Sequence, residues 1–198
     1  MASSTLKFAI FLGSTREGRQ GLRVAKFMKN QLEARNYQVE LFDPLELKFP
    51  LLEKAFHHYE NKSDAPQWMQ DCDTKLRAAD AFVVVSAEYN HSIPPALANM
   101  MDHFGESAYA YKPSGIVTYA SGIGGGVRAA MQLRIFLGVL GCLSVSDIFS
   151  IPKVHEALTD EGKPLNDHMI SGAGKLITQL EWMAAAMKNH RDAVGIPK

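Results

Sequence analysis

A glycine-rich segment near the N-terminus combines the residue types that bind a phosphate group. Residues 13–21 read Gly-Ser-Thr-Arg-Glu-Gly-Arg-Gln-Gly. Ser14 and Gln20 can donate hydrogen bonds, and Arg16 and Arg19 carry guanidinium groups that match phosphate oxygens. The glycines let the backbone turn sharply and approach a ligand closely. The segment is interpreted as a phosphate cradle, and the simpler alternative is a strand-to-helix turn with two solvated arginines.

The elements around this segment must position its donors. Residues 6–12 are almost all apolar, which is typical of a strand buried on both faces. Residues 21–35 carry apolar side chains at helical spacing. A helix that begins there points its unpaired N–H groups and the positive end of its dipole at the cradle. The segment is not a P-loop, because no Gly-Lys-Ser/Thr follows, and it is not a dinucleotide fingerprint, because the Gly-x-Gly-x-x-Gly spacing is absent.

The rest of the chain alternates between strand and helix patterns. Further strands are expected over residues 37–42, 80–86, 113–119 and 142–151, and further helices over 66–79, 96–104, 127–140 and 167–189. This alternation predicts an α/β fold with a doubly wound parallel sheet. Five strands favour the flavodoxin-like order 2-1-3-4-5 in a three-layer sandwich, with helices on both faces. We expect one domain over residues 1–198, with Asp64 able to cap the helix that carries Pro66 in its first turn.

Two more polar loops are expected beside the cradle, because strands one, three and four are neighbours in that order. Residues 87–94 read Ala-Glu-Tyr-Asn-His-Ser-Ile-Pro, and residues 121–126 read Ser-Gly-Ile-Gly-Gly-Gly. Backbone N–H groups of either loop could meet a flat heteroaromatic ring or a developing negative charge. Asn90 tolerates unusual backbone angles. Tyr89 could stack on a ring or fill the core.

The three loops together resemble the flavin-binding loops of the NAD(P)H-dependent FMN reductase family, which includes quinone, azo and chromate reductases. The resemblance covers roughly residues 6–150 and implies a flavodoxin-like fold, bound FMN and a homodimer or homotetramer. It implies FMN-binding roles for Ser14, Arg16, Arg19 and Gln20 at the phosphate, and for Ala87, Glu88, Tyr89, Asn90, Ser92, Ser121, Gly122, Gly124 and Gly125 around the isoalloxazine ring. The sequence departs from the family at Ala87, where proline is common, and this change would mainly loosen the loop.

The same resemblance implies an enzyme. NADPH or NADH would pass a hydride to FMN, and two electrons would then go to a quinone, a free flavin, an azo compound or a metal oxyanion by a ping-pong mechanism. We expect no catalytic acid or base among the side chains and no metal site. One alternative is a flavin-binding electron carrier or redox-sensing interaction protein without its own turnover. Another is a phosphate-ester hydrolase or transferase, which is less favoured because the strand ends offer Glu88 but no clustered aspartates.

Composition excludes several other classes. The chain of 198 residues has 21 basic and 21 acidic side chains, which argues against a nucleic-acid surface. Cys72 and Cys142 have neither disulfide nor zinc spacing, so we expect a reducing, cytoplasmic setting, with Cys142 as inert core. We expect no signal peptide at the N-terminus and no membrane association, since the most apolar stretch, residues 135–145, is too short to span a bilayer.

Overall fold

The computed structural model describes residues 5–197 and contains a five-stranded parallel sheet of order β2-β1-β3-β4-β5. The strands are β1 Lys7–Leu12, β2 Gln38–Phe42, β3 Ala81–Ala87, β4 Ser114–Tyr119 and β5 Ser144–Ile151. Every residue of β3 and β4 is buried, as expected for strands that are covered on both faces. The predicted flavodoxin-like strand order is confirmed.

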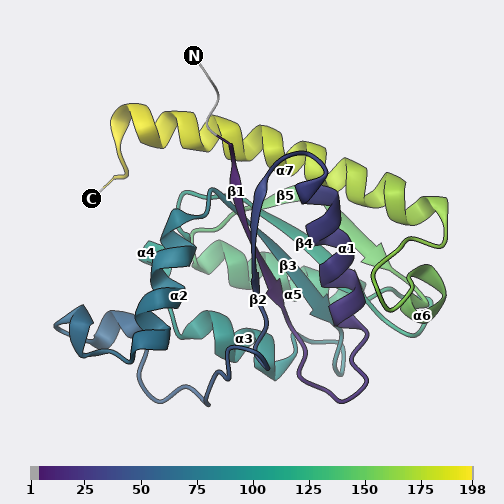
Figure 1. Cartoon of the computed structure of the whole chain (residues 1–198), viewed down its shortest axis with the longest axis horizontal. Helices are drawn as coiled ribbons and strands as arrows, with labels where there is room; N and C mark the ends of the chain where they lie inside the picture. Colours follow the sequence, from purple (N-terminus) through teal and green to yellow (C-terminus); the bar gives the residue numbers. More distant parts are fainter. Residues whose placement is uncertain (1–4, 198) are drawn as a thin grey trace.

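Helices cover both faces of this sheet (Figure 1). One core lies under α1 Gly21–Glu33 and α7 Asp167–Val194, and the other lies under α2 Gln67–Ala78, α3 Pro95–Asp102 and α5 Val127–Val139. Side chains alternate between these cores along β1: Phe8 and Ile10 join the first core, and Ala9 and Phe11 join the second. None of the helices within residues 5–197 has the length and apolar character needed to cross a bilayer.

The parallel register aligns the carboxyl ends of four strands. Leu12 of β1 pairs with Val85, Ala87 of β3 pairs with Tyr119, and Tyr119 of β4 pairs with Ile151. The loops that leave these strands therefore start at the same edge of the sheet. In open α/β sheets this edge, next to the point where the strand order reverses, is where ligands bind.

Some local predictions differ from the structure. Short helices at η1 Phe56–His58, η2 Lys62–Asp64, α4 Glu106–Tyr109 and α6 Val154–Ala157 were not expected, because three or four residues show no periodic pattern. The prediction that Asp64 caps α2 is wrong: Asp64 ends η2, and Pro66 occupies the N-cap without any side-chain cap. The last helix continues past residue 189 to Val194.

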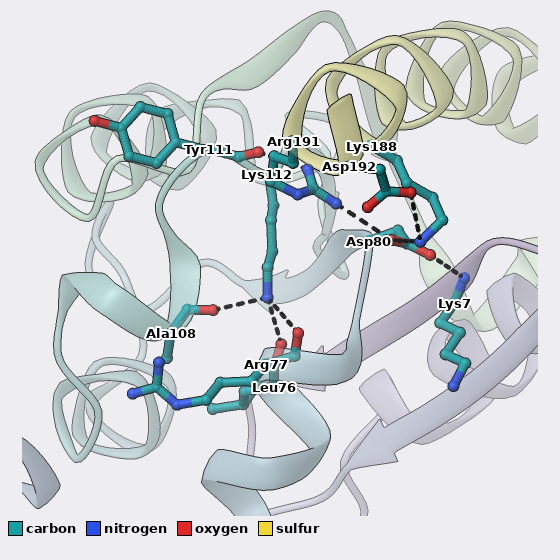
Figure 2. A network of polar contacts seen from close by, with 10 residues as sticks. All are labelled: Lys7, Leu76, Arg77, Asp80, Ala108, Tyr111, Lys112, Lys188, Arg191 and Asp192. Atoms are coloured by element: carbon teal, nitrogen blue, oxygen red, sulfur yellow. Dashed lines mark hydrogen bonds and ion pairs between the residues drawn. The ribbon is translucent and has the colours of Figure 1, made fainter. Parts of the chain in front are cut away.

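The C-terminal part of α7 is tied to the amino end of the sheet through Asp80 (Figure 2). Asp80 is 4% exposed, and its carboxylate accepts hydrogen bonds from the Lys7 backbone N–H at 3.0 Å, Lys188 Nζ at 3.0 Å and Arg191 Nη2 at 3.2 Å. A buried charge that is paired with two cations and a backbone donor has its hydrogen-bonding needs met. This contact therefore fixes α7 at the end of the sheet opposite the polar loops.

Lys112 fastens the neighbouring helices in the same region (Figure 2). Its buried Nζ donates to the carbonyl oxygens of Leu76 at 2.8 Å, Arg77 at 3.0 Å and Ala108 at 3.2 Å. Two of these carbonyls belong to the last turn of α2, where carbonyl groups have no N–H partner within the helix. Burial, with nearby Arg191 acting in the same direction, lowers the pKa of Lys112 to about 8.

Candidate functional site

A cavity of about 520 Å³ opens at the carboxyl edge of the sheet, within the size range of small-molecule sites. It brings together these predicted residues from all three loops: Ser14, Arg16, Arg19, Gln20, Ala87, Glu88, Tyr89 and Ser121. Its wall does not include the other predicted residues, which are Asn90, Ser92, Gly122, Gly124 and Gly125. The first loop and the two others thus meet at one cavity, and the turn and glycine positions lie beside it.

Ser14 and Tyr89 join the first loop to the second. The Ser14 hydroxyl is buried and lies 2.6 Å from the Tyr89 hydroxyl in a hydrogen bond. The exposed Arg16 guanidinium lies over the Tyr89 ring, 5.4 Å from its centroid, in a cation–π arrangement. Tyr89 is half-buried between these two residues, so it forms part of the cavity wall. Arg16 keeps its guanidinium donors at the mouth of the cavity.

Arg19 holds the first loop in place. Its guanidinium makes two hydrogen bonds to the Asp43 carboxylate, Nη1 to Oδ1 at 2.7 Å and Nη2 to Oδ2 at 2.5 Å. Nη1 also donates to the Ser14 carbonyl oxygen at 2.8 Å. Asp43 is fully buried just after β2. Two of the guanidinium nitrogens are thus occupied, which favours a positioning role for Arg19, and its direct contact with phosphate stays a prediction.

The groups around the start of α1 fit a phosphate. Gln20 Nε2 donates to the Gly18 carbonyl at 3.0 Å, whereas its buried Oε1 has no hydrogen-bond partner in the described part of the chain. Such unpaired buried atoms are rare in proteins. An amide oxygen accepts hydrogen bonds and cannot donate one, so the contact of Gln20 with a phosphate, which would have to be made through Nε2, stays a prediction. The first turn of α1 has no acidic residue and no side-chain cap, so its N–H groups and dipole also favour an anion.

The second loop is a tight turn. Asn90 and His91 have φ angles of 52° and 61°, and Tyr89 and Ser92 exchange backbone hydrogen bonds of 3.1 Å and 2.9 Å. Two consecutive residues with positive φ define a type I′ turn, which asparagine tolerates well. The expected unusual backbone angles at Asn90 are confirmed. The Ser92 hydroxyl donates to Gln132 Oε1 at 2.6 Å, which anchors the turn to α5.

Glu88 connects the second loop to the third. Its Oε2 accepts hydrogen bonds from the backbone N–H groups of Arg128 at 2.9 Å and Ala129 at 3.2 Å. The carboxylate therefore satisfies two otherwise unpaired donors at the N-terminus of α5 and lies at the positive end of its dipole. Glu88 lines the cavity, but its carboxylate is directed to the helix.

The third loop presents free backbone donors. Within residues 5–197, the N–H groups of residues 121–125 donate no hydrogen bond. A Cβ on Gly122 would meet nothing within 4 Å, whereas Gly125, with φ of 58°, packs against the end of β5. An exposed loop with unpaired N–H groups can donate to an electron-rich ring or to a developing negative charge.

Sequence reasoning missed part of the cavity wall. Tyr119 closes β4, and Val154 and His155 come from α6, which follows β5. The edge position after the fifth strand could have indicated Val154 and His155, since it matches the position of the other three loops. Nothing in the sequence marks Tyr119, because it completes an apolar strand.

The remaining reactive groups lie outside this site. Cys72 and Cys142 are free and buried, and burial raises their pKa values to about 11 and about 12. Thiols of this kind stay protonated and unreactive near neutral pH, as expected for Cys142. No cluster of three or more His, Cys, Asp or Glu side chains in residues 5–197 could hold a metal ion.

Comparison with known proteins places these features in context. The sequence profile of the NADPH-dependent FMN reductase family matches residues 6–156. The FMN-dependent NADPH-azoreductase of Staphylococcus saprophyticus is 29% identical over 124 residues, which cover 60% of this chain and only 62% of that protein. A quinone reductase of Pseudomonas putida is 27% identical over 174 residues, which cover 83% of this chain and 87% of that protein.

Solved structures agree on the fold. FerB from Paracoccus denitrificans, described as a flavoenzyme NAD(P)H:(acceptor) oxidoreductase, superposes with a TM-score of 0.73 at 20% identity, covering 90% of this chain and 97% of that chain. A flavodoxin from Pseudomonas aeruginosa superposes with a TM-score of 0.53 at 17% identity, covering 92% and 99%. The family profile spans most of the chain, including all three loops. The chain therefore belongs to the NADPH-dependent FMN reductase family.

Proposed function

We propose that this chain binds FMN and uses it to pass two electrons from NADPH or NADH to a quinone, a free flavin, an azo compound or a metal oxyanion. The observation that carries the proposal is a single cavity in which the anion-binding start of α1 meets the edge loops of β3 and β4. Bound FMN would supply the two-electron redox chemistry, and the protein would supply binding and electrostatics. Relatives named azoreductases and quinone reductases support the azo and quinone acceptors.

The residues divide this work by position. Ser14, Arg16 and Gln20, with the first turn of α1, would hold the phosphate. The unpaired N–H groups of residues 121–125 would stabilise negative charge on the ring system. Glu88 keeps this loop fixed by capping α5, so its donors are already oriented. The donor and the acceptor would use the same exposed side of the cavity in turn, which is a ping-pong order.

A purified, FMN-saturated chain tests the proposal. It should be yellow after removal of free flavin, and it should oxidise NADPH or NADH steadily when a quinone is supplied. A chain that stays colourless with added FMN contradicts the proposal. A yellow chain without turnover contradicts the enzyme and favours the electron carrier or redox-sensing protein.

We also propose that the chain forms a homodimer or homotetramer through α5. An apolar stripe on this helix is exposed to solvent: Val127, Met131, Ile135 and Val139, spaced four residues apart and 45–77% exposed. Exposed apolar patches of this kind mark interaction surfaces. The stripe begins at Val127, directly after the third loop, so a second copy seated there would lie close to that loop.

Light scattering of two charge variants tests the α5 interface. Ile135→Glu should convert the assembly to smaller species, because a carboxylate would be buried at the contact. Val194→Glu is the matched control, since Val194 is 67% exposed at the end of α7. A wild-type monomer, or a wild-type assembly unaffected by Ile135→Glu, contradicts this interface.

A further inference from the structure

Tyr119 lies beneath the phosphate cradle although it belongs to none of the three loop motifs. It is the last residue of β4, is 5% exposed and lines the cavity. A Cβ on Gly21 would collide with the Tyr119 hydroxyl, so this hydroxyl sits against the first residue of α1. Glycine is a poor helix former. Its use at the start of α1 is explained by the space that Tyr119 occupies.

The surroundings of the Tyr119 hydroxyl keep it a donor. Burial, then nearby Tyr89, raise the pKa of Tyr119, and the Ser14 hydroxyl, Arg19 and the Gly21 backbone amide act in the opposite direction. A phenol with the ordinary tyrosine pKa of 10 is already protonated at physiological pH, and the raised pKa of Tyr119 leaves it so. A protonated phenol can donate to a phosphate dianion, whereas a phenolate would repel it.

We propose that Tyr119 is a phosphate-positioning residue that donates its hydroxyl hydrogen bond to the phosphate of bound FMN from the floor of the cradle. This inference rests on the proposed function and deepens it. The neighbouring Ser14 hydroxyl is already linked to Tyr89 at 2.6 Å, so Tyr119 brings a further hydroxyl to the start of α1. Tyr119 thereby favours a flavin with a phosphate over riboflavin, which has the same ring system without it.

Paired affinity measurements isolate this contact. Dissociation constants for FMN and for riboflavin would be measured with flavin-free wild type, Tyr119→Phe and Tyr109→Phe. Tyr109 is the matched control, because its fully buried hydroxyl donates to the Met101 carbonyl at 3.0 Å and lies outside the cavity wall. We expect Tyr119→Phe to weaken FMN binding about 10-fold or more while riboflavin binding is unchanged. Tyr109→Phe should leave both affinities unchanged.

Thermal unfolding with inorganic phosphate gives a second readout that does not need the flavin ring. Phosphate should raise the unfolding temperature of the flavin-free wild type more than that of Tyr119→Phe. Equal phosphate stabilisation, unchanged FMN affinity, or an equal loss for FMN and riboflavin overturns the role of Tyr119. A wild type that binds neither flavin instead overturns the proposed function, and this inference with it.

Discussion

Asp43 and Arg19 form a two-point ion pair between the end of β2 and the phosphate loop, with N–O distances of 2.7 Å and 2.5 Å. The Asp43 side chain is fully buried, and the Arg19 side chain is 11% exposed. Asp43 Oδ1 also accepts the Leu45 backbone N–H at 3.0 Å. The pair therefore fixes the loop that presents Ser14 and Arg16, whether or not Arg19 itself reaches a ligand.

Removing the Asp43 carboxylate should destabilise the fold and weaken FMN binding together. Asp43→Ala leaves the Arg19 charge without its buried partner, and we expect a loss of about 3 kcal/mol in the free energy of unfolding. Urea denaturation measures this loss, and flavin titration measures the affinity. Lys75→Ala is the control, since the Lys75–Glu40 pair is exposed and should contribute about 0.5 kcal/mol or less. Equal losses in both variants would contradict the anchoring role of Asp43.

Arg16 should govern how much FMN is bound and not how fast bound FMN turns over. Its guanidinium is exposed at the cradle, so Arg16→Gln should weaken FMN binding roughly 10- to 150-fold. Activity divided by flavin content should stay close to the wild-type value. Lys29→Gln, a partly exposed cation elsewhere on α1, should change neither quantity. A large drop in the normalised rate at full occupancy would count against this division of roles.

Glu88 should contribute to stability through α5. Glu88→Ala removes the acceptor of two backbone N–H groups, and we expect the free energy of unfolding to fall by about 1 kcal/mol. Glu88→Gln keeps one oxygen acceptor, so its free energy of unfolding should fall by less. Glu156→Ala, at an exposed position on α6, serves as the control in the same thermal unfolding series. If Glu88→Ala matches this control, Glu88 is not a functional cap.

Much of the fold follows from local patterns, and much of the site does not. The buried apolar runs predict β1, β3 and β4, and the three loops at their ends follow from the strand order. The Arg19–Asp43 pair joins residues 24 positions apart, and no sequence pattern around either residue predicts it. Tyr119 reads as an apolar strand residue, and only the tertiary approach of α1 places its hydroxyl at the cradle. From the sequence, Glu88 is predicted only as a ligand-binding residue. Its bond to the start of α5 follows only from the position of that helix.

The contribution of Lys112 to the free energy of unfolding should change with pH in the alkaline range (Figure 2). Its pKa is lowered from 10.5 to about 8 in the folded chain, mainly by burial. Between these values the unfolded chain binds more protons, so the Lys112 contribution to stability rises as pH increases from about 8 to about 10.5. The difference in unfolding free energy between wild type and Lys112→Met should therefore grow by roughly 1–3 kcal/mol over this interval.

The buried thiols contribute to the pH dependence of stability in the opposite direction. Their contribution cancels when the unfolding free energy of Lys112→Met is subtracted from that of wild type at each pH. The raised pKa values of Cys72 and Cys142 make their contribution fall as pH rises above about 9 in both proteins. Urea denaturation in reducing buffer at several pH values provides the comparison. A difference that stays constant or shrinks with pH would show that Lys112 is not held with a lowered pKa.

The most direct test of FMN-dependent turnover is anaerobic stopped-flow mixing of the FMN-saturated chain with NADPH, and separately with NADH. The visible absorption of the bound flavin should bleach with at least one of the two donors and should return when a quinone is then added. Flavin that is bound but is bleached by neither donor, or flavin that is bleached but not reoxidised by the quinone, would contradict the proposed oxidoreductase activity.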